Sequence, residues 1–152
     1  MKNIINKILI SLITIFSSLT MAHDAEISGL WFEAMNFPSS SVLKFEKVND
    51  SWHGKYTQVS AAQIRWGYSI DETIIKGKFV KEHFVGKVLI KNSKKAKAYC
   101  KNTKDRWEDI KMEFIDSDKL YGSWYQHKID YKGNCDITAV GWQTYGLERL
   151  KQ

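Results

Sequence analysis

The sequence predicts an all-β domain, in which an antiparallel up-and-down meander closes into a barrel of roughly eight strands. Three observations lead to this prediction. Short segments of alternating apolar and polar residues are joined by polar turns. A glycine followed two residues later by an aromatic ring recurs about every 24 residues, a step that fits two short strands and two turns. The 152 residues include one proline and 13% aromatic residues, a composition that excludes a disordered chain.

The recurring pair of a glycine and a ring explains how such a sheet curls. Residues i and i+2 of a strand share a face, so each copy places a glycine beside a large side chain. We expect the glycine to leave room for a crossing chain or a bulge, while the ring fills the space. The copies are Gly29–Trp31, Gly54–Tyr56, Gly77–Phe79 and Gly122–Trp124, and Gly146 lies one further step along without a ring.

The individual strands follow from alternation and from the turns between them. The clearest hairpin joins two alternating segments through the two-residue turn Asn49-Asp50. In the segment 61–69, alternate positions place Ile64, Trp66 and Tyr68 on one face, which predicts a strand. The strands are expected at residues 28–35, 42–48, 52–59, 61–69, 73–80, 83–91, 110–114, 119–130, 135–142 and 144–150. The polar and basic stretch 92–106 breaks the pattern, and at most one or two turns of helix are expected within it.

The N-terminal segment has the pattern of a secretory signal peptide. Lys2 and Lys7 form a basic start, an apolar run covers 8–19, and Ala22 offers a small residue at a cleavage site. We expect a signal peptide at 1–22 and a single barrel domain at 23–152, located in the periplasm of a bacterium or secreted. A membrane anchor is the alternative, but the run is short and no basic stop follows it. We expect no membrane span after cleavage.

Charge and cysteine content bound the chemistry of the mature chain. The formal charge of +6 includes the two lysines of the signal, so the mature domain keeps about +4, which permits attraction to anionic partners. Cys100 and Cys135 are the two cysteines, and an exported chain with two cysteines usually pairs them. Neither has a second ligand at metal-binding spacing, so a disulfide is expected at this pair and no metal site.

Two short motifs resemble those of the calycin group, which includes lipocalins and avidins. Gly29-Leu-Trp31 looks like the Gly-x-Trp of the first calycin strand, and Arg149 lies on the last expected strand. The resemblance implies that Arg149 packs over Trp31 and closes the base of a calycin-like, eight-stranded barrel. It also implies a cavity at the opposite end, as in many members of the group. The residues with which avidin contacts biotin have no match here, so biotin binding is not implied.

The aromatic residues are the candidate binding site. Tryptophan and tyrosine combine a broad apolar face with one polar group, which suits a small apolar or sugar-like ligand. The alternative is that these rings fill the barrel completely. The sequence contains no nucleophile elbow, zinc-protease motif or phosphate-binding loop, so we expect a non-catalytic protein without a cofactor. The ligand-binding candidates are Trp52, Tyr56, Trp66, Tyr68, Trp124 and Trp142.

Two other functions remain open from the sequence. A small exported β domain with a disulfide also fits an inhibitor or immunity-type protein that acts through its outer surface, so a protein partner, such as a cell-wall-targeting enzyme, is the main alternative to a small-molecule ligand. His23 would be the first mature residue after cleavage, and its amine and imidazole together form a copper-binding pair. The basic run 91–106 either grips an anionic surface or keeps a loop soluble. Nucleic acid is not expected as a partner, because the chain is exported and lacks a binding motif.

Overall fold

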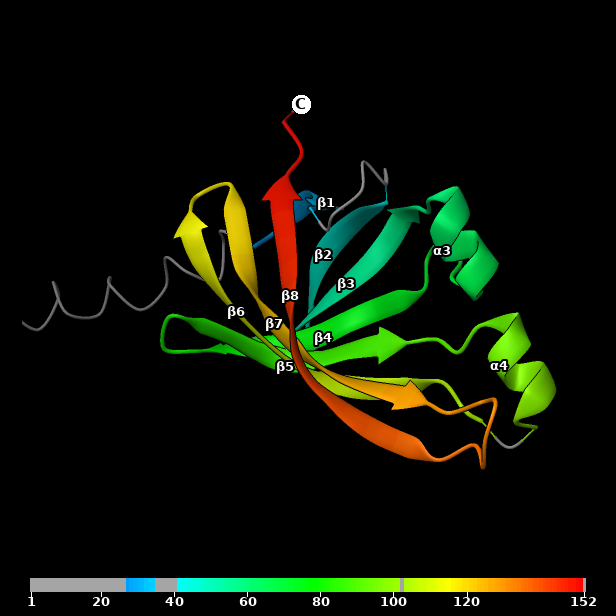
Figure 1. The fold of residues 1–152 in the computed structure, drawn as a ribbon. Helices are drawn as coiled ribbons and strands as arrows, with labels where there is room; N and C mark the ends of the chain where they lie inside the picture. Colours follow the sequence, from blue (N-terminus) through cyan, green and yellow to red (C-terminus); the bar gives the residue numbers. More distant parts are fainter. Residues whose placement is uncertain (1–26, 35–40, 102, 152) are drawn as a thin grey trace, which may run out of the picture.

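The computed structural model describes residues 27–34, 41–101 and 103–151, which form eight strands and two short helices (Figure 1). The expected signal peptide 1–22 and His23 lie outside the described residues. The elements, in chain order, are β1 (Gly29–Glu33), β2 (Val42–Val48), β3 (Ser51–Gln58), α3 (Ala61–Trp66), β4 (Thr73–Val80), β5 (His83–Ile90), α4 (Lys94–Tyr99), β6 (Arg106–Asp116), β7 (Lys119–Ile129) and β8 (Ile137–Arg149).

The sheet is a closed barrel. Each strand pairs antiparallel with the next along the chain, and β8 pairs with β1, where Trp31 lies opposite Arg149. Closure gives every strand two neighbours, so the barrel presents no free edge. The predicted all-β, up-and-down barrel of eight strands is therefore confirmed.

The two ends of the barrel differ because antiparallel strands place successive connections at alternate ends. The connections after β2, β4 and β6 are two-residue turns, and we call this the closed end. The connections after β3, β5 and β7 are longer, and two of them contain α3 and α4; we call this the mouth end. Figure 1 shows both helices on the same side of the barrel. The long connections leave space for a site at the mouth end.

Aromatic side chains fill the interior toward the closed end. Phe79 and Phe114 stack with ring centroids 5.8 Å apart, and Trp31 packs against Phe114 at 6.2 Å. Phe45 and Phe84 meet edge to face at 6.2 Å. Stacked, tilted and edge-to-face ring pairs of this kind stabilise a core beyond the burial of apolar area alone. We call these five residues the aromatic plug.

The glycines of the repeat allow close approach, as the sequence predicted. Gly77 lies opposite Gly86, and a Cβ at Gly77 would stand 2.8 Å from the Cα of Gly86. A Cβ at Gly122 would overlap the backbone carbonyl of Lys111. Distances this short are not tolerated by any larger residue without a shift of the backbone, so these positions bring β4 against β5 and β6 against β7.

The prediction of a strand at 61–69 is wrong, because α3 occupies 61–66. Local signals explain the helix. The side chain of Ser60 accepts a hydrogen bond from the backbone N–H of Gln63, which caps the first turn. Gly67 has φ +92° and ends the helix in the left-handed conformation. Ala61 and Ala62 are strong helix formers. The strand was predicted because the large side chains Ile64, Trp66 and Tyr68 occupy alternate positions in this segment.

The last strand is continuous, where the sequence predicted two. β8 runs through Gly141, which has φ +111°. The register between β7 and β8 shifts between Gln126 and His127, so a bulge absorbs the irregularity. The predicted break at Gln143 is wrong, because Gln143 pairs with Trp124 within the β7–β8 ladder, and the nearby Gly141 lies beside the bulge without ending the strand.

Two expected long-range contacts are present. Cys100 and Cys135 form a disulfide with their Cα atoms 5.7 Å apart, which joins the end of α4 to the connection between β7 and β8. The guanidinium carbon of Arg149 lies 4.3 Å from the centroid of the Trp31 ring. Arg149 Nη1 also donates a hydrogen bond of 2.8 Å to the carbonyl of Ser28. Arg149 thus covers Trp31 and ties the segment before β1 to the end of β8.

Candidate functional site

A pocket of about 450 Å³ opens at the mouth end of the barrel. It lies between α3 and the strands, and its walls are mainly apolar. A pocket of this size, apolar with a few polar groups, is typical of sites for small molecules. The apolar side chains that line it are Ala62, Trp66, Ile74, Val88, Leu89, Ile90 and Trp124.

The carboxylate of Glu33 lines this pocket and is only 6% exposed. Its Oε1 atom accepts hydrogen bonds from the hydroxyls of Tyr56, at 2.9 Å, and Tyr145, at 2.8 Å. Gln63 Nε2 donates to the other oxygen at 3.1 Å. The four residues come from β1, β3, β8 and α3, so the folded barrel assembles a cluster from segments far apart in sequence. We call Glu33, Tyr56, Gln63 and Tyr145 the carboxylate cluster.

Burial dominates the electrostatics of the carboxylate cluster. It raises the pKa of Glu33, although the hydrogen bonds from Tyr145, Gln63 and Tyr56 oppose that rise. Burial and the neighbouring Glu33 hold the pKa of Tyr56 and of Tyr145 well above their usual range. Both hydroxyls therefore stay protonated at neutral pH and donate to Glu33. A carboxylate offers about four acceptor positions, and three are used here, so Glu33 retains capacity for one further donor.

Helix α3 positions Gln63 over this carboxylate. The backbone N–H of Ser60 donates to the hydroxyl of Ser41 at 3.0 Å, which fixes the start of the helix beside β2. One turn of helix then places Gln63 toward Glu33, while Trp66 stands at the rim of the pocket. The short capped helix thus forms one wall of the site.

The rim opposite the start of α3 is tied down by Tyr68 and Lys91. The Tyr68 hydroxyl donates to the carbonyl of Leu89 at 2.9 Å and accepts from the backbone N–H of Lys91 at 3.2 Å. Burial raises the pKa of Tyr68 to about 12, so the hydroxyl remains a donor at neutral pH. Lys91 Nζ pairs with Glu72 at 2.6 Å and donates to the carbonyl of Gly67 at 2.7 Å. These contacts hold the segment after α3 against β5.

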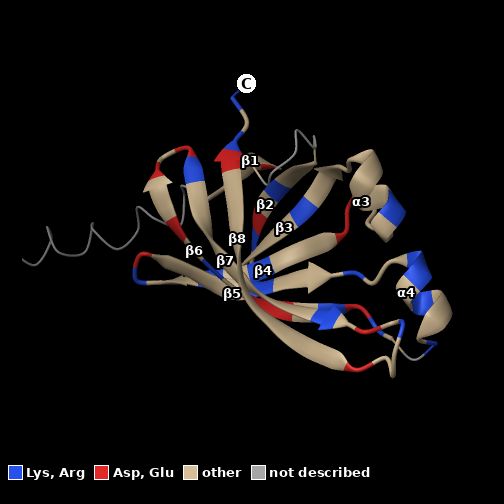
Figure 2. Cartoon of the chain, in the orientation of Figure 1, with Lys and Arg blue, Asp and Glu red and all other residues tan. Residues whose placement is uncertain are grey.

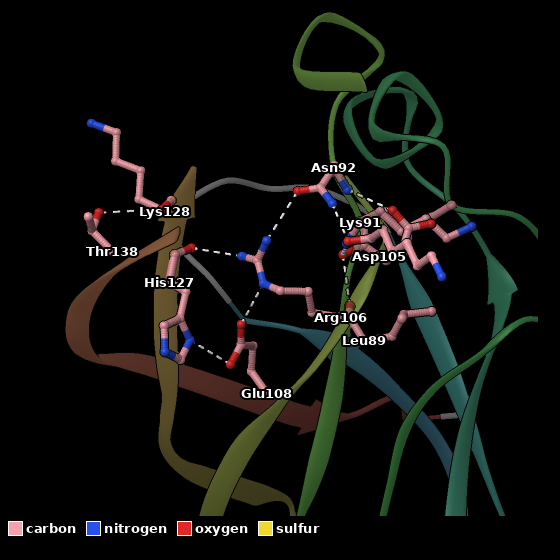
Figure 3. A network of polar contacts seen from close by, with 11 residues as sticks. Leu89, Lys91, Asn92, Asp105, Arg106, Glu108, His127, Lys128 and Thr138 are labelled. Carbon is pink, nitrogen blue, oxygen red and sulfur yellow. Dashed lines mark hydrogen bonds and ion pairs between the residues drawn. The ribbon is translucent and has the colours of Figure 1, made fainter. Parts of the chain in front are cut away.

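A second polar network fixes the other side of the mouth end (Figure 3). Arg106 Nε contacts Glu108 at 2.8 Å, and its Nη2 donates to the carbonyl of His127 at 3.0 Å. The Nδ1 atom of His127 lies 2.7 Å from the other oxygen of Glu108. Arg106 also reaches Asn92, whose side chain donates to the carbonyl of Lys104. The network links β6 and β7 to the segment around α4 and keeps that side of the mouth in place.

The structure brings four of the six predicted ligand-binding residues together, because Tyr56, Trp66, Tyr68 and Trp124 line the pocket. Trp52 is buried in the core toward the closed end, since β3 begins at a closed-end turn. Trp142 is 55% exposed on the outer wall, where its ring meets that of Tyr125 at 5.4 Å. Alternation puts Trp142 on the face opposite Tyr145, which points inward.

Sequence reasoning missed Glu33, Gln63 and Tyr145 as site residues. A signal existed for two of them, because Glu33 follows Trp31 by two positions and Tyr145 precedes Leu147 by two, and alternation places each pair on one face. A charged residue in phase with a buried tryptophan indicates an inward-facing carboxylate. Gln63 carried a local signal only, as the third residue after the helix cap Ser60.

Replacing Glu33 with glutamine is expected to change how stability depends on pH. The pKa of Glu33 is raised on folding, so its favourable contribution is fully present below 4.5, its ordinary pKa, and is lost as pH rises through the raised value. The variant lacks this titration. Its free energy of unfolding should therefore increase relative to wild type as pH rises above 4.5, by about 1.4 kcal/mol for each unit of pKa shift. Urea titrations between acidic and neutral pH measure the difference.

The matched control for this experiment is Glu46→Gln. Glu46 lies on the surface with its side chain 42% exposed, and its hydrogen bond and charge interaction with Lys44 lower its pKa. Its contribution is therefore present above 4.5 and is lost as pH falls, so the difference from wild type should run in the opposite direction. A Glu33→Gln difference that is flat with pH, or that has the sign of the control, would contradict the buried carboxylate.

Two findings concern metals and membranes. Among residues 27–34, 41–101 and 103–151, no three His, Cys, Asp or Glu side chains gather closely enough to hold a metal ion. Within the same residues, no helix has the length and apolar character needed to cross a membrane. Comparison with protein-family models, with curated proteins and with solved structures finds no match for this chain.

Proposed function

We propose that this protein is an exported, calycin-like barrel that binds a small apolar or sugar-like ligand in the pocket at its mouth end, without catalysis. The observation that carries the proposal is the carboxylate of Glu33, buried at a mainly apolar pocket and held by three donors from distant segments. Burying a carboxylate costs free energy, so a ligand that donates to its remaining acceptor position recovers part of that cost.

Two further observations support the class of protein. Arg149 over the Trp31 ring is the arrangement that the calycin resemblance implies for the closed end of the barrel. The disulfide between Cys100 and Cys135 supports export, because disulfides form and persist in oxidising compartments.

The pocket favours a ligand with a flat apolar body and at least one hydrogen-bond donor. Trp66 and Trp124 line the cavity, and the faces of tryptophan rings accept apolar rings, alkyl chains or the apolar face of a sugar. Glu33 then accepts from a hydroxyl or N–H group of that ligand. The volume of about 450 Å³ limits the ligand to the size of a small molecule.

The test is retention of a ligand by the full-length protein, purified from the exported fraction of its native host and measured by native mass spectrometry. We expect a bound small molecule that is lost on denaturation. Binding of N-phenyl-1-naphthylamine, a neutral apolar probe with one N–H donor, gives a second readout by fluorescence. Trp124→Ala should weaken probe binding by about tenfold, because one aromatic wall of the pocket is removed.

The matched control is Trp142→Ala, which removes the same side chain from the outer wall and should leave probe binding unchanged. Equal effects of the two substitutions, or an empty protein that ignores the probe, would contradict a pocket ligand. Co-purification of a protein chain with an empty pocket would instead favour the alternative, an inhibitor or immunity-type protein that acts through its outer surface.

A further inference from the structure

Large apolar side chains stand in solvent on α3, which forms one wall of the pocket, and in the segment that follows it. Ile64 and Trp66 on α3 are 57% and 51% exposed, and Ile70 in the segment that follows is 60% exposed. Trp66 both lines the pocket and is about half exposed to solvent. Soluble proteins rarely leave a group of such side chains uncovered beside a binding pocket without an interaction to cover it.

Lysines gather at the same end of the barrel, in the segment around α4. Figure 2 shows basic residues on α4, which lies beside α3 at the mouth end. Between 91 and 106 the only carboxylate in the sequence is Asp105, and it is committed to Lys97, at 2.9 Å, and to the backbone N–H of Asn92. The basic charge of this segment therefore exceeds its acidic charge. Its exposed lysines are Lys94, Lys95, Lys97, Lys101 and Lys104.

We propose that the mouth end docks on the surface of an anionic lipid bilayer. Ile64, Trp66 and Ile70 would enter the interfacial region, where tryptophan is favoured and isoleucine leaves water. The lysines of the α4 segment would face the anionic headgroups, to which basic residues are attracted within about one Debye length. The inference rests on the proposed pocket ligand for its purpose, because docking lets an apolar ligand pass between bilayer and pocket without crossing water.

The position of Trp66 favours a bilayer over an acidic protein as the occupant. A protein partner that covers Trp66 would also cover part of the pocket rim, and so would hinder exchange of the ligand. A bilayer covers the same side chain and at the same time supplies apolar molecules to the opening. Lysine side chains are long and flexible, so their ammonium groups can reach lipid headgroups that move within the bilayer surface.

The experiment is flotation of the full-length, purified protein with lipid vesicles. Vesicles of phosphatidylethanolamine containing about 30 mol% phosphatidylglycerol provide the anionic surface, and phosphatidylcholine vesicles provide the neutral one. We expect at least tenfold more protein bound to the anionic vesicles, and loss of most of that binding at about 0.5 M salt, where charge interactions are screened. Brominated lipid should quench tryptophan fluorescence in the bound protein, and this quenching should fall in the Trp66→Ser variant.

Two multiple variants separate the apolar and charged contributions, each with a matched control. Ile64→Ser/Trp66→Ser/Ile70→Ser should reduce vesicle binding at least tenfold, whereas Val85→Ser/Ile115→Ser/Trp142→Ser, which changes exposed apolar residues elsewhere on the barrel, should not. Lys94→Glu/Lys95→Glu should have a similar effect, whereas Lys78→Glu/Lys111→Glu on the outer wall should not. All substituted side chains are exposed, so the variants should fold, and near-ultraviolet circular dichroism checks this.

The outcomes distinguish docking from ligand binding. Trp124→Ala should weaken probe binding by about tenfold but keep vesicle binding, since Trp124 lines the pocket. Probe binding without vesicle binding would overturn the docking surface and leave the pocket proposal standing. Equal binding to both kinds of vesicle, equal loss in the control variants, or loss on charge reversal without loss in the apolar variant would also overturn it. So would capture of an acidic protein by a mouth end that ignores vesicles.

Discussion

Replacing Trp31 with alanine is expected to lower the free energy of unfolding by about 3–5 kcal/mol, the range for removing a large aromatic side chain from a core. Trp31 is fully buried, packs against Phe114 in the aromatic plug and donates from its indole N–H to the carbonyl of Ile27 at 2.8 Å. Its loss also removes the ring beneath Arg149. Urea unfolding followed by circular dichroism measures the change.

Trp142→Ala is the matched control, because it removes the same side chain from an exposed position on the barrel. We expect that control to cost less than about 1 kcal/mol, as is usual for surface substitutions. Trp31→Phe should cost less than Trp31→Ala, because a ring remains to pack against Phe114. A loss below about 1 kcal/mol for Trp31→Ala would show that the closed end does not depend on this residue.

Removing the disulfide with Cys100→Ser/Cys135→Ser is expected to lower the free energy of unfolding by about 3–4 kcal/mol. The two cysteines are 35 positions apart, and the bridge limits the conformations of the unfolded chain over that loop. It joins α4 to the connection between β7 and β8 at the mouth end, so its loss should also loosen the segment that carries the exposed lysines. Hydrogen exchange of residues 94–101 gives a local readout beside the global one.

Reduced wild-type protein is the control for this variant, since it breaks the same bridge without changing the side chains. Wild type in a reducing agent and the double variant should unfold at similar urea concentrations, and the variant should not respond to the reductant. If oxidised wild type and the variant were equally stable, the bridge would hold no part of the fold together, and the expectation would fail.

The sequence determined most of the strands, because alternation with period two and two-residue turns are local signals. β4 was predicted with its observed bounds, 73–80, and the predicted hairpin around Asn49-Asp50 corresponds to β2 and β3. The disulfide also followed from the sequence, since only one pair of cysteines exists. α3 was not predicted, although Ser60 and Gln63 are typical of a helix start and Gly67 of a helix end. The large residues between them alternate in the way expected of a strand.

Only the tertiary structure decided which part of the barrel interior is filled by side chains and which part contains the pocket. Alternation shows which side chains face inward, but it does not show the height at which they meet inside a barrel, because that depends on the register of all eight strands. Register placed Trp52 in the core and Trp124 at the pocket. It also joined Glu33 to Tyr145, 112 positions away, and so created the buried carboxylate on which the proposed function depends.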